Sequence, residues 1–298
     1  MSQHTNTVEL VKNEGWDERI LVLRNGELVD TFIIVTKRYV VVVDTMINPE
    51  TAVSLLHHAQ QHLKNNRQLL VINTHADYDH AWGNQVFNAP IIGAYQCAEI
   101  LRDEETETRL AQMQANEPHI FSNVSLTPPT LLFEETLTID GGDLTLELFA
   151  TPGHTTDHVS LYIPEIDTLL AGDAAELPFP FARTPSDLPH MRRSLAKLAD
   201  IEADTVLYCH APVTIGPQLI QDNIAYFDKL EEHCRIALAQ GMSAQPDADA
   251  DVAALINLTF DAATPHTAPW QNVHEYYRAT GHAQQIRTIL AWINSGKR

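Results

Sequence analysis

Seven side chains of the kinds that bind divalent metal ions occur in four groups along the sequence. The residues are His75, Asp77, Asp79 and His80, then His154, then Asp173, and finally His210. Imidazole nitrogens and carboxylate oxygens are common protein ligands of zinc, iron and manganese. Because seven such groups exceed the needs of a single four-coordinate ion, we expect two ions bound side by side.

Each of the four groups follows directly on a predicted β-strand. Apolar segments at 69–72, 144–149, 168–171 and 205–208 stop at the short polar loops that contain the groups. Loops at strand ends can converge on one edge of a sheet, and rigid strands fix their positions. In the first loop the alternate residues 75, 77 and 79 can point the same way while His80 turns aside. We therefore expect this single loop to serve both ions.

The elements that precede these loops read as strands followed by one helix. Residues 20–43 alternate apolar stretches with turn signals and predict a β-meander. The run at 39–43 is continuously apolar, which is typical of a strand covered on both faces, and it stops at Asp44. Asn48 and Pro49 then predict the start of a helix, because Asn is a preferred N-cap and Pro suits the first turn.

Two regions depart from this strand-and-loop pattern. Residues 94–133 read as an insertion, which is charged and helical to about residue 117 and then continues as a proline-containing loop outside the core. After Pro217 the pattern is helical to the end, with helices expected at 218–239, 247–257 and 270–294. The sequence therefore predicts one domain at residues 1–215 and a helical C-terminal extension at 216–298.

Composition and charge exclude several classes of protein. The chain has 298 residues, 44% of them hydrophobic, and a formal net charge of -20. It can bury a full core, and its charge repels the phosphate backbone of nucleic acid. The first residues lack the basic start and apolar stretch of an export signal, and no apolar run reaches the roughly 20 residues that cross a bilayer. Three widely spaced cysteines fit reduced thiols, so we expect a cytoplasmic protein that binds neither nucleic acid nor membrane.

The order and spacing of the metal-binding residue types resemble the metallo-β-lactamase superfamily, whose pattern is HxHxDH followed by a distant His, Asp and His. The residues that match this pattern in order are His75, Asp79, His80, His154, Asp173 and His210. His154 stands within Thr-Pro-Gly-His-Thr and Asp173 within Ala-Gly-Asp, and Asp44-Thr45 resembles the Asp-Thr-Gly strand end of the family. The resemblance covers about residues 20–215 and does not include the helical extension.

The resemblance implies an α+β fold, a four-layer αββα sandwich with the metal ions at one edge of the paired sheets. By the same resemblance the first ion would be bound by His75, Asp77 and His154, and the second by Asp79, His80 and His210. Asp173 would bridge the ions, and a hydroxide between them would be the nucleophile. Asp79 and Asp173 would then act directly in catalysis, and no side-chain nucleophile would be needed.

Asp77 departs from the family pattern, because it stands where the second histidine of HxHxDH would be. An acidic residue there resembles the diiron flavodiiron branch, which carries Glu, and so do the 18 residues between His154 and Asp173. The formal charges of two divalent ions, three carboxylates and one hydroxide cancel. Such a cluster would bind anions less strongly, and accept iron or manganese more readily, than a cluster with histidine at position 77. We expect zinc first, with iron or manganese as alternatives. Asp77 could instead be an acid outside the metal shell.

The general acid that protonates the leaving group has three candidates near the ligands in sequence: His158, Tyr208 and His190. His158 follows a Gly-His-Thr turn and would serve equally well as a structural, hydrogen-bonding histidine. Arg183 comes after Asp173 and could meet an anionic substrate, although a solvated surface position is the simpler interpretation.

Three functions are compatible with these residues. The first is a dinuclear metallohydrolase that cleaves an ester, lactone, thioester or phosphoester of a small molecule, with the helical extension shaping the pocket. The second is a diiron oxidoreductase acting on oxygen or nitric oxide. Residues 216–298 contain no glycine-rich loop for a flavin, so that enzyme would need a separate electron donor. The third is a metal-stabilised binding module without turnover.

An acidic, helix-capped domain of this size is also compatible with a homodimer.

Overall fold

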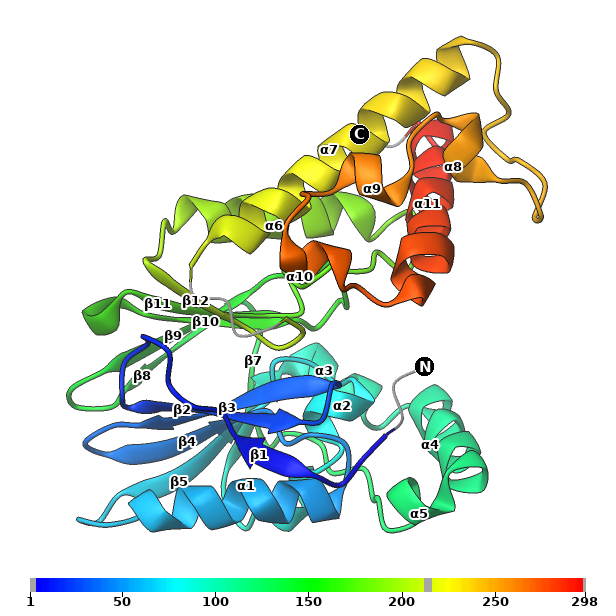
Figure 1. Ribbon diagram of the computed structural model, residues 1–298. Helices are drawn as coiled ribbons and strands as arrows, with labels where there is room; N and C mark the ends of the chain where they lie inside the picture. Colours follow the sequence, from blue (N-terminus) through cyan, green and yellow to red (C-terminus); the bar gives the residue numbers. More distant parts are fainter. Residues whose placement is uncertain (1–3, 212–215, 297–298) are drawn as a thin grey trace.

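The computed structural model describes residues 4–211 and 216–296 of the chain. Two β-sheets face each other in the middle of the molecule, and helices cover the outer face of each sheet (Figure 1). Helix α1 (Pro49–His62) lies on the first sheet, whereas α6 (Leu188–Asp200) and the C-terminal helices lie on the second (Figure 1). The predicted four-layer αββα sandwich with a helical C-terminal region is therefore confirmed.

The first sheet has the strand order β1-β2-β3-β4-β5-β6-β7. Its strands within the described residues are β1 (Val8–Leu10), β2 (Ile20–Asn25), β3 (Val29–Val35), β4 (Tyr39–Val43), β5 (Gln68–Ile72), β6 (Ile91–Ala94) and β7 (Leu131–Phe133). Strands β1 to β4 pair antiparallel, as the predicted meander requires, and β4 to β7 pair parallel. The parallel strands β4 and β5 therefore bring Asp44 and the loop after Ile72 to the same edge of the sheet.

The second sheet has the strand order β12-β11-β10-β9-β8. Its strands are β8 (Thr136–Asp140), β9 (Thr145–Ala150), β10 (Val159–Ile163), β11 (Thr168–Gly172) and β12 (Thr205–Tyr208). Most neighbours pair antiparallel, but β11 and β12 pair parallel. This one parallel pair delivers Asp173 and His210 to a common edge, because both residues follow the carboxyl ends of their strands.

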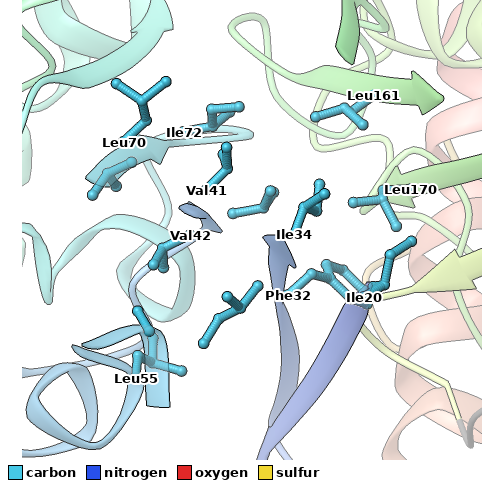
Figure 2. Packing of buried hydrophobic residues seen from close by; sticks show 14 of the residues in the cluster. Ile20, Phe32, Ile34, Val41, Val42, Leu55, Leu70, Ile72, Leu161 and Leu170 are labelled. Atoms are coloured by element: carbon cyan, nitrogen blue, oxygen red, sulfur yellow. The ribbon is translucent and has the colours of Figure 1, made fainter. Parts of the chain in front are cut away.

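The main core lies between the two sheets. Val41 and Ile34 of the first sheet and Leu161 and Leu170 of the second are at most 2% exposed (Figure 2). Leu55 of α1 belongs to the same cluster, so the first sheet is covered on both faces. Burying a side chain of this size contributes roughly 1.5–3 kcal/mol. This packing holds the strand ends, and the loops that leave them, in fixed positions.

Helix α1 begins where the sequence predicts it. The Asn48 side chain accepts a hydrogen bond from the Thr51 backbone N–H (2.9 Å), and the Thr51 hydroxyl accepts one from the Asn48 N–H (3.3 Å). This capping box satisfies two amides that a helix start leaves unpaired. The other helical segments before the C-terminal region are α2 (Tyr78–Ala81), η1 (Asn84–Val86), α3 (Tyr95–Ile100), α4 (Glu104–Asn116), α5 (Pro118–Phe121) and η2 (Pro164–Ile166).

The segment 94–133 differs in part from its prediction. The helices expected before residue 117 are present as α3 and α4, but β6 ahead of them is a strand that the sequence pattern did not predict. Phe121 is fully buried and packs against Trp82, with ring centroids 6.0 Å apart. Residues 131–133 form β7 and extend the first sheet. The expectation that residues 118–133 lie outside the core is therefore wrong, because this segment closes the sheet and buries an aromatic side chain.

The C-terminal helices pack against α6 and the outer face of the second sheet (Figure 1). They are α7 (Gln218–Ala239), α8 (Val252–Leu255), α9 (Phe260–Ala263), α10 (Ala268–Gln271), the π-helical turn η3 (Tyr277–Gly281) and α11 (His282–Asn294). Helix α7 covers its predicted range. The helix predicted at 247–257 is shorter, because it begins only after the N-cap Asp251, whose side chain accepts from the Ala254 N–H, and ends before Asn257, which takes a positive φ of 53°. The helix predicted at 270–294 is interrupted at 272–274.

One buried cluster joins the C-terminal helices to the sandwich. Leu195 of α6, Tyr226 of α7 and Leu290 of α11 are at most 1% exposed and share this cluster with Leu169 and Val206 of the second sheet. The predicted domain boundary after residue 215 falls at 212–215, which lie outside the described residues. None of the described helices is long and apolar enough to cross a membrane.

The shared cluster predicts a large stability difference between two leucines of the C-terminal region. Leu290→Ala should lower the free energy of unfolding by about 2–5 kcal/mol, because it leaves a cavity at a fully buried position. Leu255→Ala is the matched control, since Leu255 is 48% exposed and its truncation should cost less than about 0.5 kcal/mol. Urea unfolding followed by circular dichroism measures both. Equal effects of the two substitutions would contradict the packing of α11 on the sandwich.

Candidate metal centre

The seven predicted ligand residues lie together where the carboxyl ends of the strands meet. Asp173 occupies the centre of the group, because its Oδ2 atom faces four imidazole rings. The Nε2 atoms lie 3.2 Å (His210), 3.3 Å (His80), 3.6 Å (His75) and 3.6 Å (His154) from this oxygen. Three segments far apart in the chain thus converge on the residue that follows β11.

The remaining two carboxylates divide the histidines into two sets. Asp77 Oδ2 lies 3.4 Å from His154 Nε2 and 3.6 Å from His75 Nε2. Asp79 Oδ2 lies 3.5 Å from His210 Nε2 and 3.9 Å from His80 Nε2. Each of these groups of three residues has its ligand atoms within 4.8 Å of one another. The Asp173 carboxylate lies between these two sets of side chains.

Hydrogen bonds at the far side of three rings direct their Nε2 lone pairs into the site. His210 Nδ1 lies 2.6 Å from the Leu28 carbonyl oxygen, which can only accept, so Nδ1 carries the proton. His80 Nδ1 lies 2.8 Å from the carboxylate of Asp44, which leads to the same tautomer. A neutral imidazole with the proton on Nδ1 has an unshared electron pair on Nε2, the form that binds a metal ion.

Asp44 orients the ligands from behind the site. Its side chain is fully buried, and it accepts hydrogen bonds from the Thr74 backbone N–H and the Thr74 hydroxyl, both at 2.7 Å. Because the Thr74 hydroxyl gives its proton to Asp44, its oxygen is left to accept from His75 Nδ1 at 3.0 Å. Asp44 thus sets the ring of His80 directly and the tautomer of His75 through Thr74. The φ of Asp44 is 67°, a left-handed conformation that Asp tolerates better than most residues.

The geometry fits a metal ion. Two ligands bonded at about 2.0–2.1 Å with a tetrahedral angle between them lie roughly 3.4 Å apart, which matches the separations between the imidazole and carboxylate atoms. His75 Nε2 and Asp173 Oδ1 are buried and have no hydrogen-bond partner among the described residues. Lone pairs that face one another in a buried place repel, so a cation between them satisfies both.

The charges of the site influence the pKa values of its histidines in the absence of metal. Burial opposes protonation of His80, but the carboxylates around it, Asp173 first, raise its pKa well above the usual value. Burial also opposes protonation of His210, yet Asp173 raises the pKa of His210 to about 10. Burial disfavours ionisation of Asp77, but hydrogen bonding to His154 and His75 holds the pKa of its carboxyl well below normal. Protons therefore occupy the metal-free site at neutral pH.

His158 makes two hydrogen bonds within the protein, as the structural alternative for this residue expects. The Asp173 backbone N–H donates to His158 Nε2 (2.9 Å), so Nδ1 carries the proton and donates to the Thr151 hydroxyl (2.8 Å). Burial and the neighbouring His75 hold the pKa of the fully buried His158 well below its usual value. Neither ring nitrogen is free for a substrate. The ring also explains Gly172, because a Cβ there would lie 2.5 Å from His158 Nε2.

Tyr208 and His190 are not placed to protonate a leaving group either. The Tyr208 hydroxyl donates to the Gly216 carbonyl oxygen at 2.7 Å, and the side chain is buried in the cluster beneath the C-terminal helices. Burial raises the pKa of Tyr208 above its usual value, which further weakens it as an acid. His190 is exposed on α6 and lies outside the set of described residues that line the cleft over the site.

A cleft of about 1090 Å³ opens over the candidate ligands. Arg183 lines it, donates to Asp77 Oδ2 and keeps 45% of its side chain exposed, so this solvated arginine also faces the site. Arg109, on α4, also lines it, with Nη1 3.9 Å from Asp77 Oδ1. Sequence reasoning did not single out Arg109, because no local pattern shows that α4 faces the site.

Glu176 is a second lining residue that sequence reasoning missed. It is 6% exposed, and its Oε1 lies 3.8 Å from His154 Nδ1. Burial, together with the nearby Asp173 carboxylate, raises the pKa of Glu176 to about 7. The signal available in the sequence was its position three residues after Asp173, in the loop that starts at a ligand.

The fold and the convergent ligand set define a metal-binding αββα protein. The family model of the metallo-beta-lactamase superfamily matches residues 24–210, more than half of the chain, and the chain belongs to this superfamily. The hydroxyacylglutathione hydrolase of Hahella chejuensis is 29% identical over 150 residues, which are 45% of this chain and 56% of that protein. The hydroxyacylglutathione hydrolase of Pseudomonas aeruginosa strain LESB58 is 32% identical over 124 residues, 39% of this chain and 47% of that protein. The chain thus spans about half the length of these curated relatives.

A solved structure shares the fold beyond the family region. The sec-alkylsulfatase Pisa1 from Pseudomonas sp. superposes with a TM-score of 0.63 and 18% identity, covering 92% of this chain and 49% of that chain. This coverage exceeds the region matched by the family model, so most of the C-terminal helices also have counterparts in that fold.

The pKa values predict that metal binding depends on pH. His80, His154 and His210 have raised pKa values in the metal-free site, so an ion must displace protons to bind at pH 7. Raising the pH removes this competition, and zinc affinity should rise about tenfold per pH unit for each proton released. Zinc titrations at pH 6, 7 and 8 against a chelator of known affinity measure the slope. A flat profile would contradict the protonated, metal-free site.

Asp44 should matter for metal affinity without contacting the ion. Asp44→Asn removes the charged partner of His80 Nδ1 and should weaken zinc binding about 10- to 100-fold. Asp30→Asn is the matched control, because this buried carboxylate pairs with Arg24 and not with a predicted ligand. Competition with a chromogenic chelator reports both. The orienting role fails if Asp44→Asn binds zinc as tightly as Asp30→Asn does.

Proposed function

We propose that the protein is a dinuclear metal-dependent hydrolase that cleaves an ester or thioester of a small molecule. The single observation that carries this proposal is the position of Asp173 Oδ2, which four imidazole Nε2 atoms face at 3.2–3.6 Å beneath an open cleft. One shared carboxylate between two sets of ligands supports two ions in contact with the same substrate.

The proposed ligand sets are two of the groups of described residues whose ligand atoms lie within 4.8 Å of one another. The first ion would be bound by His75, Asp77 and His154, the second by Asp79, His80 and His210, and Asp173 would bridge them. The sets contain imidazole and carboxylate but no thiolate, which suits zinc, manganese and iron. Asp44, Thr74 and the Leu28 carbonyl hold three of the rings in their tautomers before any ion binds.

Two divalent ions in such a site supply a water nucleophile of lowered pKa and polarise the carbonyl oxygen of the substrate. In the overall reaction the water oxygen forms a bond to the acyl carbon, and the bond from that carbon to sulfur or oxygen breaks. The acyl part leaves as a carboxylic acid, and the other product takes the second proton of the water as a thiol or alcohol. A thiolate needs little help from a general acid, which agrees with the structural roles of His158 and Tyr208.

The names of the relatives favour ester and thioester substrates over lactones and phosphoesters, and the size of the cleft favours a small molecule. The relatives reported above are named for the hydrolysis of a hydroxyacylglutathione, which is chemically a thioester. The cleft of about 1090 Å³ is at the upper end of the range typical of small-molecule sites, roughly 300–1,000 Å³. A small-molecule substrate, and no nucleic acid or membrane partner, therefore remains our proposal, and the homodimer stays a prediction.

A diiron oxidoreductase is the second candidate, because Asp77 gives the first ligand set an oxygen in place of a nitrogen. Metal analysis of the protein purified without added metal separates the candidates. Two zinc or two manganese ions per chain would support the hydrolase, and two iron ions would call for oxygen-consumption assays. No metal, even after reconstitution, would leave the non-catalytic module as the better account.

Asp173→Asn should lower kcat/KM for an acyl thioester at least about a hundredfold and reduce the bound metal to one ion or fewer per chain, because it weakens the proposed bridge. His58→Ala, on α1, should change neither value. Thioester hydrolysis followed by thiol release, together with elemental analysis, gives both readouts. Full activity of Asp173→Asn with two ions bound would overturn the dinuclear mechanism.

A further inference from the structure

Two arginines from separate elements face the same wall of the cleft. Arg183 comes from the loop after β11, and Arg109 comes from α4. Both lie beside Asp77: Arg183 donates to its Oδ2 and lies 3.3 Å from His154 Nε2, and Arg109 lies 3.9 Å from its Oδ1. Their side chains are 45% and 46% exposed, so a molecule in the cleft can reach both guanidinium groups.

The charges of this wall do not cancel. Of the other charged side chains that line the cleft, Arg24 pairs with Asp30, and the carboxylates of Glu27, Asp79, Asp173 and Glu176 also belong to the lining. Arg109 and Arg183 together face a single carboxylate, that of Asp77, which the proposed first ion would also neutralise. Beside Asp77, therefore, two guanidinium groups meet one carboxylate, in a protein whose net charge is -20. Such a focus of positive charge overcomes the general repulsion of anions.

Both guanidinium groups are held in position by neighbouring residues. The Arg109 guanidinium carbon lies 5.2 Å from the centre of the Tyr78 ring, a cation–π contact that restrains the side chain. The backbone of the residue before Arg183 is also held in place. The buried Gln285 of α11 accepts from the Ala182 N–H (3.2 Å) and donates to the Ala182 carbonyl oxygen (3.5 Å). A guanidinium has five N–H donors, so each arginine keeps donors beyond those used on Asp77.

The wall next to the arginines is aromatic. Phe181 lies two residues before Arg183 and packs against Tyr277 of η3, with ring centroids 5.8 Å apart. Gly281 allows this contact, because a Cβ there would lie 2.9 Å from Phe181 Cζ. The cleft thus presents two kinds of surface side by side, a cationic one at the metal centre and an apolar one formed by the C-terminal region.

We propose that Arg109 and Arg183 form a subsite for an anionic group of the substrate, a carboxylate, sulfonate or phosphate placed close to the scissile bond. The substrate class is then an acyl ester or thioester with one anionic group and one apolar group, the latter lying against Phe181 and Tyr277. The acyl bond in this assignment rests on the proposed hydrolase function, whereas the anion subsite stands on the two arginines. Arginine suits this task because its planar fork binds such oxyanions through paired hydrogen bonds.

Binding of two thioethers that differ only in charge tests the subsite without turnover. The probes are the thioether of 3-mercaptopropionate with a 2-phenylethyl group and the corresponding primary amide, in which a CH2 group replaces the thioester carbonyl, so that neither contains a thioester bond to hydrolyse. Isothermal titration of the zinc-loaded protein should show the carboxylate probe binding at least about tenfold more tightly than the amide probe. No preference, or no binding of the carboxylate probe at millimolar concentration, would overturn the proposal.

Matched variants show whether the arginines or the metal ions cause the tighter binding of the carboxylate probe. Arg109→Gln should reduce the carboxylate preference about tenfold and leave binding of the amide probe unchanged, whereas Arg102→Gln, an exposed arginine just before α4, should leave both unchanged. Arg183→Gln should have the same effect as Arg109→Gln. A preference that survives in both cleft variants would belong to the ions and would overturn the subsite.

Turnover of the matching thioesters distinguishes this proposal from the function on which it partly rests. Phenylacetyl thioesters of 3-mercaptopropionate and of its amide should differ mainly in KM, and Arg109→Gln should remove that difference with kcat retained. If neither thioester is cleaved but the thioethers bind with the expected charge preference, the hydrolase fails and the anion subsite stands. If both are cleaved with equal KM, the hydrolase stands and the subsite fails.

Discussion

The structure depends on one electrostatic constraint: four imidazole nitrogens face a single oxygen of Asp173 in a buried place. Lone pairs on nitrogen and oxygen repel at such distances unless a cation or protons lie between them. The protein enforces this geometry from outside the ligand set, through Asp44, Thr74 and the Leu28 carbonyl. It is a preorganised cation site, since the rings are turned toward the centre by bonds that need no metal.

Neither sheet contains this site by itself. The first sheet supplies Asp44 and the loop that follows β5, and the second supplies His154, Asp173 and His210. The sandwich brings the two halves together because its strands are locked between apolar layers, as the cluster around Val41, Ile34 and Leu170 illustrates (Figure 2). Even the glycines of the ligand motifs serve this assembly, since Gly172 lets His158 pack behind Asp173. The packing of the core therefore also fixes the positions of the side chains in the candidate metal centre.

The C-terminal helices complete the cleft. The side-chain amide of Asn223 in α7 forms hydrogen bonds with the backbone of Glu176 and Pro178. The side-chain amide of Gln285 in α11 forms one with the backbone of Ala182, so two buried amides hold the loop that follows Asp173. That loop carries Glu176, Phe181 and Arg183 into the cleft. Helices outside the matched family region thus hold the loop whose side chains line the cleft, which agrees with the general separation of chemistry from specificity within one fold.

The candidate ligand residues and the strands behind them could be predicted from the sequence, because the spacing of His75 to His80 is local and apolar runs that stop at polar loops follow from strand periodicity. Only the tertiary structure decided how His158, Tyr208 and Arg183 are used. Each depends on a partner from elsewhere in the fold, namely the Asp173 amide, the Gly216 carbonyl and the Asp77 carboxylate. The burial of Phe121 likewise depends on Trp82, and the place of residues 131–133 in the sheet depends on the pairing of β7 with β6. Such pairings arise from chain closure over long separations, which local sequence patterns do not encode.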